Sequence, residues 1–215
     1  MPLRVVCRAQ YLSESVPEMR DSDYKATHLV KAVKGLELNP KSYAWVTIAG
    51  VNTKITEETK DKAIEWFARW AAQRVDSSSN GPKVLVPIPS SKTIKSSSDT
   101  FRTAAIAREI AANCKTDVVA APLLRWTQVM LSSREGGPRD PKILYPRLTL
   151  LGALPEGRCV LIDDVFTSGG HLIASAWKLE DVGREVELAI CCGRSMHEQL
   201  DNPASVGDEI LDLAR

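Results

Sequence analysis

The segment 160–171 brings together residue types that could carry out chemistry at one place. It reads Val-Leu-Ile-Asp-Asp-Val-Phe-Thr-Ser-Gly-Gly-His, so a short apolar run is followed by two adjacent carboxylates, Asp163 and Asp164. Hydroxyls and glycines come next, ahead of a helical pattern. Paired carboxylates suit the hydroxyl groups of a sugar or a hard divalent cation such as Mg²⁺.

The residues after the carboxylates form the second half of this pattern. They are Thr167, Ser168, Gly169, Gly170 and His171. Glycines allow a tight loop, and the backbone N–H groups of such a loop at a helix N-terminus attract phosphate. Phosphate at one end and hydroxyl groups or a metal at the other describe a phosphorylated pentose.

Other interpretations of this segment fit its spacing less well. An Asp-Asp pair alone is usually a solvated turn, and Thr-Ser-Gly-Gly alone is usually a flexible loop. A Walker phosphate loop requires GxxxxGK[ST], which the sequence lacks. A phosphatase of the haloacid dehalogenase type requires DxDxT, but position 165 is Val. The combined pattern therefore favours the sugar-phosphate interpretation.

The elements that must position these residues are short apolar runs separated by helical patterns. Unalternating apolar runs of this kind are typical of parallel strands covered on both faces. The expected fold is α/β, with an open, mainly parallel twisted sheet and helices on both faces. Ligands of such sheets bind beyond the carboxyl ends of the strands. The apolar runs are 83–89, 117–124, 158–162 and 186–192, and the helical patterns between them are 103–114 and 172–179.

The N-terminal part of the chain shows a different pattern. A helix is expected over 26–33, ended by Gly35, and a strand over 43–49. A second helix is expected from a cap at Thr56 to about Arg74, before the serine-rich loop 76–82. We therefore divide the chain into an N-terminal α+β segment (1–75), a core (83–195) and a C-terminal extension (196–215).

Composition limits the class of protein. The 215 residues carry a net charge of +1, which argues against a dedicated nucleic-acid binder. No apolar run approaches the roughly 18 residues of a membrane helix, and the N-terminus does not resemble a secretory signal. The five cysteines, without a CxxC pair, predict reduced thiols in a cytoplasmic protein rather than a zinc site.

Segment 160–171 resembles the phosphoribosyl-pyrophosphate (PRPP) motif of type I phosphoribosyltransferases. The resemblance implies that Asp163 and Asp164 hold the ribose hydroxyls together with Mg²⁺, and act in catalysis. It also implies that residues 167–171 hold the 5′-phosphate. The family usually has Thr or Ser where this chain has His171. Type I enzymes build a hood over the acceptor from variable termini, and segment 1–75 is expected to form it.

Two further loops take roles from the same resemblance. The loop after the first core strand binds pyrophosphate in this family, and here it contains Ser90, Ser91 and Lys92. A long mobile loop after the second core strand closes over the reaction, and segment 132–142 is placed to be that loop. Its Arg134 is expected to neutralise the departing pyrophosphate, with Arg139 and Lys142 as alternatives.

The implied activity is that of a PRPP-dependent pentosyltransferase. It would transfer ribose 5-phosphate to a nitrogen of a nucleobase-like acceptor and release pyrophosphate, assisted by Mg²⁺. The acceptor is not defined, and a homodimer is left open. One alternative is a non-catalytic PRPP- or nucleotide-binding regulator. Another is a competence-type accessory protein, because residues 125–128 and 132–134 resemble that branch of the family.

Overall fold

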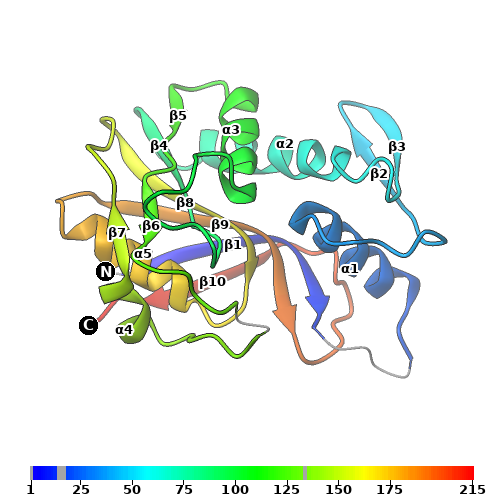
Figure 1. The fold of residues 1–215 in the computed structure, drawn as a ribbon. Helices are drawn as coiled ribbons and strands as arrows, with labels where there is room; N and C mark the ends of the chain where they lie inside the picture. The colour runs from blue at the N-terminus through cyan, green and yellow to red at the C-terminus, as the bar shows by residue number, and fades with distance from the viewer. Residues whose placement is uncertain (1, 14–17, 133–134) are drawn as a thin grey trace.

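The computed structural model describes residues 2–13, 18–132 and 135–215, which form an α/β fold around a six-stranded sheet (Figure 1). The strand order is β10–β1–β9–β8–β4–β5, and every neighbouring pair is parallel except β1 with β10. The strands of this sheet are β1 (Pro2–Leu12), β4 (Lys83–Pro87), β5 (Val118–Ala120), β8 (Arg158–Phe166), β9 (Val186–Met196) and β10 (Gly207–Asp212). The expected mainly parallel sheet is confirmed.

The other elements are five helices, two small antiparallel strand pairs and one 3₁₀ turn within the described residues. The helices are α1 (Asp21–Lys34), α2 (Lys62–Asp76), α3 (Arg102–Asn113), α4 (Pro141–Leu144) and α5 (Gly170–Glu180). The strand pairs are β2 (Ala44–Ile48) with β3 (Val51–Ile55) and β6 (Leu124–Trp126) with β7 (Leu148–Leu150), and the 3₁₀ turn is η2 (Tyr145–Arg147). None of the helices in the described ranges is long and apolar enough to cross a membrane.

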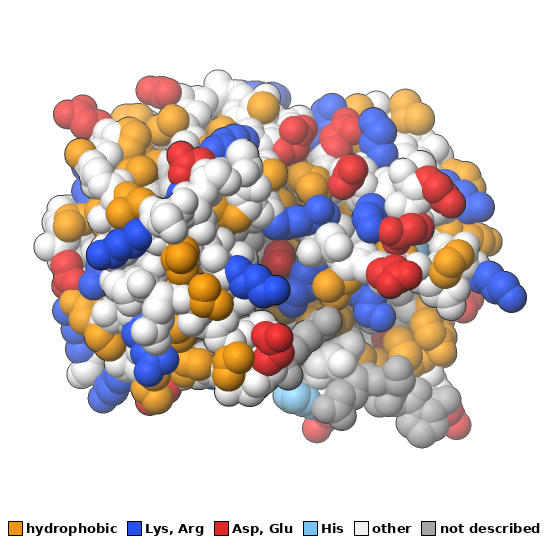
Figure 2. Space-filling model, viewed as in Figure 1, with side chains coloured by type: hydrophobic (Ala, Val, Ile, Leu, Met, Phe, Trp, Pro, Cys, Tyr) orange, Lys and Arg blue, Asp and Glu red, His pale blue; other side chains and the backbone are white. Residues whose placement is uncertain are grey.

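Helices cover both faces of the sheet, as expected. One core contains α1, α2 and α3 with Ile162 and Cys192, and the other contains α5 with Leu161 and Cys191. Neighbouring strand residues point to opposite faces, which explains why the two adjacent cysteines lie in different cores. On the surface shown in Figure 2, acidic and basic side chains are interspersed, consistent with the small net charge.

Strand β8 extends further than the sequence indicated. The apolar run predicts a strand that stops before the acid pair, but β8 continues to Phe166. The reason is its neighbour β9, since Asp163 pairs in register with Cys191 and Phe166 pairs with Arg194. The acid pair therefore belongs to a hydrogen-bonded strand, which limits its backbone freedom.

The N-terminal segment contributes one strand to the six-stranded sheet, and its remaining elements lie outside that sheet. Strand β1 lies inside the sheet between β9 and β10, where Val6 is paired with both Ile190 and Asp208. The C-terminal extension contributes β10 at the sheet edge. Only the residues after β1, which form α1, the β2–β3 hairpin and α2, remain available for a hood.

The start of helix α2 differs from the expectation. The helix begins at Lys62, whereas the predicted cap was Thr56. The Thr56 hydroxyl instead donates to the Glu58 carboxylate (2.7 Å), and the Lys62 N–H donates to the Thr59 carbonyl (2.9 Å). These local bonds turn the chain before the helix starts, so the predicted cap is wrong.

We expect Gly193→Ala to lower the free energy of unfolding by about 1–3 kcal/mol, the usual cost of overpacking. A Cβ at this position of β9 would lie 2.7 Å from both methyl carbons of Val30 on α1. Urea denaturation measures the change. Val30 is itself buried, so Val30→Ala should destabilise the wild type but cost less in the Gly193→Ala background, where it also removes the clash. Equal costs in the two backgrounds would show that the contact is not the cause.

Candidate functional site

The acid pair lies near the carboxyl end of β8, where both residues are partly buried. The backbone N–H of Asp164 donates to Oδ1 of Asp163 at 2.8 Å. Desolvation raises the pKa of Asp163, and the neighbouring Asp164 carboxylate raises it further. The Asp164 N–H and the positive charge of Lys34 act in the opposite direction. Hydroxyl donors would suit this pair, because they stabilise carboxylates without adding negative charge.

Helices α1 and α3 bring basic side chains towards the acid pair. Arg102 donates from Nε to the Val33 carbonyl and from Nη2 to the Ala32 carbonyl, both at 2.7 Å. It thereby satisfies carbonyls at the end of α1, which have no partner within the helix. Its charge also acts on Asp164, as the charge of Lys34 acts on Asp163. The sequence pattern did not indicate either residue, since neither lies near the acid pair along the chain.

The expected phosphate loop lies at the N-terminus of α5, immediately after β8. Thr167 and Ser168 are exposed, and Gly169 precedes the helix with φ +80°, a left-handed conformation that favours glycine. The N-cap residue of this helix, Gly169, makes no side-chain capping hydrogen bond. The first N–H groups of a helix have no acceptor within it, so this end of α5 can accept an anion.

His171 is the one residue of this loop that departs from the family pattern. Its ring meets the ring of Trp126 edge-on, with 5.6 Å between centroids and 84° between planes. Burial lowers the pKa of His171, so the ring is neutral at pH 7. Phosphate binding here would therefore rely on backbone N–H groups and hydroxyls rather than on a histidine charge.

The expected pyrophosphate loop lies beside the acid pair. Strands β4 and β8 are neighbours, and the Ile88 N–H donates to the Ile162 carbonyl at 2.9 Å, one residue before Asp163. Ser90 and Ser91 follow at the end of this segment, and Lys92 is exposed. The two loops that the sequence predicts around one ligand therefore follow the carboxyl ends of adjacent parallel strands.

The long loop between β6 and α4 approaches the expected phosphate loop. A Cβ added at Gly170 would lie 1.7 Å from the Arg139 carbonyl oxygen, so the backbone at Arg139 packs directly against the start of α5. Glu135 belongs to this long loop. Hydrogen bonds from Ser132 lower the pKa of the Glu135 carboxyl, and the positive charge of Lys92, from the loop after β4, lowers it further. Arg134 lies outside the described residues.

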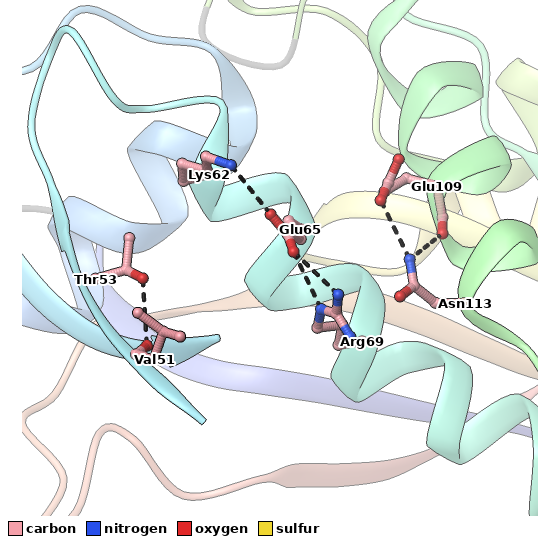
Figure 3. Close-up of polar contacts among 7 residues, drawn as sticks. All are labelled: Val51, Thr53, Lys62, Glu65, Arg69, Glu109 and Asn113. Atoms are coloured by element: carbon pink, nitrogen blue, oxygen red, sulfur yellow. Dashed lines mark hydrogen bonds and ion pairs between the residues drawn. The ribbon is translucent and has the colours of Figure 1, made fainter. Parts of the chain in front are cut away.

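A separate groove of about 470 Å³ lies between α2 and α3. Figure 3 shows Glu65 on α2, paired with Lys62 and Arg69, and Glu109 on α3, which accepts from Asn113. The lining includes four acidic side chains, namely Glu58, Asp61, Glu65 and Glu109. Their negative charge does not suit a phosphate, so this groove is not the expected site.

Comparison with known proteins gives fold likeness alone. Neither a family model nor a curated protein matches the chain. Several solved structures are similar to it. These are phosphoribosyltransferases. The adenine phosphoribosyltransferase of Thermoanaerobacter pseudethanolicus is 15% identical, with a TM-score of 0.41 over 77% of this chain and 87% of that one.

Two further structures give similar values. The adenine enzyme of Trypanosoma brucei, in complex with AMP, pyrophosphate and ribose-5-phosphate, is 13% identical with a TM-score of 0.42 over 89% of this chain and 87% of that one. The orotate enzyme of Aeropyrum pernix is 14% identical with a TM-score of 0.38, over 79% and 83% respectively. At these identities the function has to follow from the residues of this chain.

The donor set fits Mg²⁺ shared with a substrate rather than a metal held by protein alone. Among the described residues, no group of three or more His, Cys, Asp and Glu side chains could hold a metal ion. Mg²⁺ is commonly held by one or two carboxylates together with substrate phosphates. Asp163 and Asp164 offer such carboxylates.

Proposed function

We propose that the protein binds PRPP at the carboxyl ends of β4 and β8 and transfers its ribose 5-phosphate to a nitrogen of a nucleobase-like acceptor. One observation carries the proposal: the acid pair on β8 leads directly into the uncapped N-terminus of α5, with the 88–92 loop alongside. This arrangement offers acceptors for ribose hydroxyls between two sites that suit phosphate groups.

The reaction breaks the bond between ribose C1 and a pyrophosphate oxygen and forms a bond from C1 to the acceptor nitrogen, which loses a proton. Positive charge develops on the ribose and negative charge on pyrophosphate. Asp163 and Asp164 would orient the ribose and stabilise its charge, while the N–H groups of residues 167–171 hold the 5′-phosphate. Ser90, Ser91 and Lys92 would receive pyrophosphate.

Mg²⁺, held by Asp163 and Asp164 with the substrate, would supply positive charge for the leaving pyrophosphate. No covalent nucleophile is required, because preorganised charges at both ends of the breaking bond stabilise the transition state. The segment from α1 to α2 would provide the hood over the acceptor. Three expectations stay predictions: that Arg134 neutralises the departing pyrophosphate, that the protein is cytoplasmic, and that it forms a homodimer.

Isothermal titration with PRPP and Mg²⁺ tests the proposal. The wild-type protein should bind PRPP saturably, and Asp164→Asn should weaken the binding. Asp117→Asn is the matched control, because Asp117 is an exposed acid that precedes β5. Absence of PRPP binding by the wild-type protein would overturn the proposal.

A second measurement separates an enzyme from a PRPP-binding regulator. Pyrophosphate release is followed with PRPP, Mg²⁺ and a panel of purine and pyrimidine bases. Release that depends on one class of base supports the transferase. PRPP binding without release by any base supports the regulator instead.

A further inference from the structure

Trp126 contacts both loops of the proposed site. It is almost fully buried, at 1% exposure, and is the last residue of β6. Its indole Nε1–H donates to the Pro89 carbonyl (3.2 Å), and its backbone N–H donates to the Thr93 carbonyl (3.0 Å). Its ring also meets the ring of His171 on α5, 5.6 Å away. One side chain therefore touches the segment before Ser90 and the first turn of the phosphate-loop helix.

The pyrophosphate loop is fixed around these contacts. Pro89 and Thr93 flank residues 90–92, and the Thr93 N–H donates to the Ser90 carbonyl (2.8 Å). The Ser91 carbonyl accepts from the Met130 N–H (2.8 Å), which belongs to the long loop that follows β6. Any shift of Trp126 would therefore move the backbone that presents Ser90, Ser91 and Lys92.

His171 completes the connection. The family usually has Thr or Ser at this position, whereas the neutral imidazole of His171 packs against the ring of Trp126. A Thr or Ser at this position could contact phosphate but would lack a ring to reach the indole. A phosphate bound at the N-terminus of α5 would restrict the backbone of His171, and therefore the position of the ring that packs on Trp126.

We propose that Trp126 is a positioning residue that couples the two phosphate subsites, so that an anion in one raises the affinity of the other. This inference rests on the proposed function. A phosphate beside His171 would hold the indole in place, and the indole would hold the Pro89–Thr93 backbone ready for pyrophosphate. Coupling of this kind is reciprocal, so each ligand must strengthen the other by the same factor.

The test uses two probes, ribose 5-phosphate and magnesium pyrophosphate, titrated separately and each in the presence of a saturating amount of the other. We expect the wild-type protein to bind each probe at least about 5-fold more tightly when the other is present. Trp126→Phe keeps a ring for His171 but loses the bond to Pro89. His171→Thr keeps a hydroxyl for phosphate but loses the ring. Each variant should reduce the coupling factor towards one, and the double variant should reduce it no further.

Trp177→Phe is the matched control. Trp177 is also buried, at 3% exposure, and its indole N–H also donates to a carbonyl, that of Leu213 (2.8 Å). Its loss should leave the coupling factor unchanged. A merely structural role of Trp126 would lower both affinities while keeping their mutual effect, and that result would overturn the inference. So would wild-type protein that binds both probes independently, whereas failure to bind either probe would overturn the proposed function itself.

Discussion

Asp163→Asn should give a protein that binds PRPP about 10–100-fold more weakly and yet unfolds less easily at pH 8 than the wild type. The loss of affinity, about 10–100-fold for each charge-assisted hydrogen bond, follows from replacing a carboxylate by a neutral amide at the ribose hydroxyls. The amide oxygen can still accept the Asp164 N–H, which bonds Asp163 at 2.8 Å, so the backbone there need not change.

The gain in stability follows from the raised pKa of Asp163. Because the folded state holds this proton more tightly than the unfolded state, the free energy of unfolding falls as pH rises from the unfolded pKa, about 4, to the folded pKa. Above the folded pKa the full cost of ionising the carboxyl is present. Asparagine does not ionise, so the variant should be more stable than the wild type at pH 8 and no more stable below about pH 4.

Urea denaturation at pH 8 and pH 4, with titration of PRPP at pH 8, measures both effects. In the wild type, PRPP affinity should fall as pH drops through the raised pKa of Asp163, because the protonated acid cannot accept from the ribose hydroxyls on both oxygens. Asp117→Asn should change neither stability nor affinity. A variant that lost PRPP affinity and also lost stability at pH 8 would show that Asp163 serves the fold rather than a ligand.

The parts of the fold that could be predicted are those with a local cause. Runs such as 186–192 are apolar without alternation because both faces of the strand are buried, so the parallel sheet follows from the sequence. Gly35 ends α1 with φ +73°, and the sequence marks that end for the same conformational reason. The acid pair and glycine loop were visible because they are contiguous.

The missed features depend on partners far along the chain. Strand β1 contains Arg4 and Arg8, which interrupt its apolar residues, yet it lies inside the sheet. Arg8 is tolerated there because its guanidinium stacks over the Trp66 and Trp70 rings of α2, at 4.8 and 5.8 Å from their centroids. No local pattern reveals such a contact, nor the reach of Trp126 to His171. The contiguous acid pair and glycine loop of the candidate site were predictable, whereas Lys34, Arg102 and Trp126, which reach them from other elements, were not.

Gly170→Ala should lower the affinity for ribose 5-phosphate by at least about 10-fold, through backbone displacement rather than loss of the helix. A Cβ at this first residue of α5 would lie 1.7 Å from the Arg139 carbonyl oxygen, so one of the two backbones must move. Arg139 directly precedes Asp140, which caps α4 by accepting from the Lys142 N–H (2.8 Å), and α4 is held in the core by its buried Leu144. Movement of α5 would instead displace the N–H groups assigned to the phosphate.

Helix propensity makes this prediction distinctive. Alanine is favoured over glycine by up to about 1 kcal/mol in a helix interior and by less at its first residue, so without the clash Gly170→Ala would be at least as stable as the wild type and would bind normally. Isothermal titration with ribose 5-phosphate and thermal unfolding measure the two quantities. Gly207→Ala is the matched control, since a Cβ there would make only ordinary contacts at 3.6 Å. A stabilised Gly170→Ala protein with unchanged affinity would mean that the Arg139 backbone does not rest on α5 in solution. A destabilised protein with weakened binding would place the long loop against the phosphate-binding end of the helix, where it could respond to the ligand.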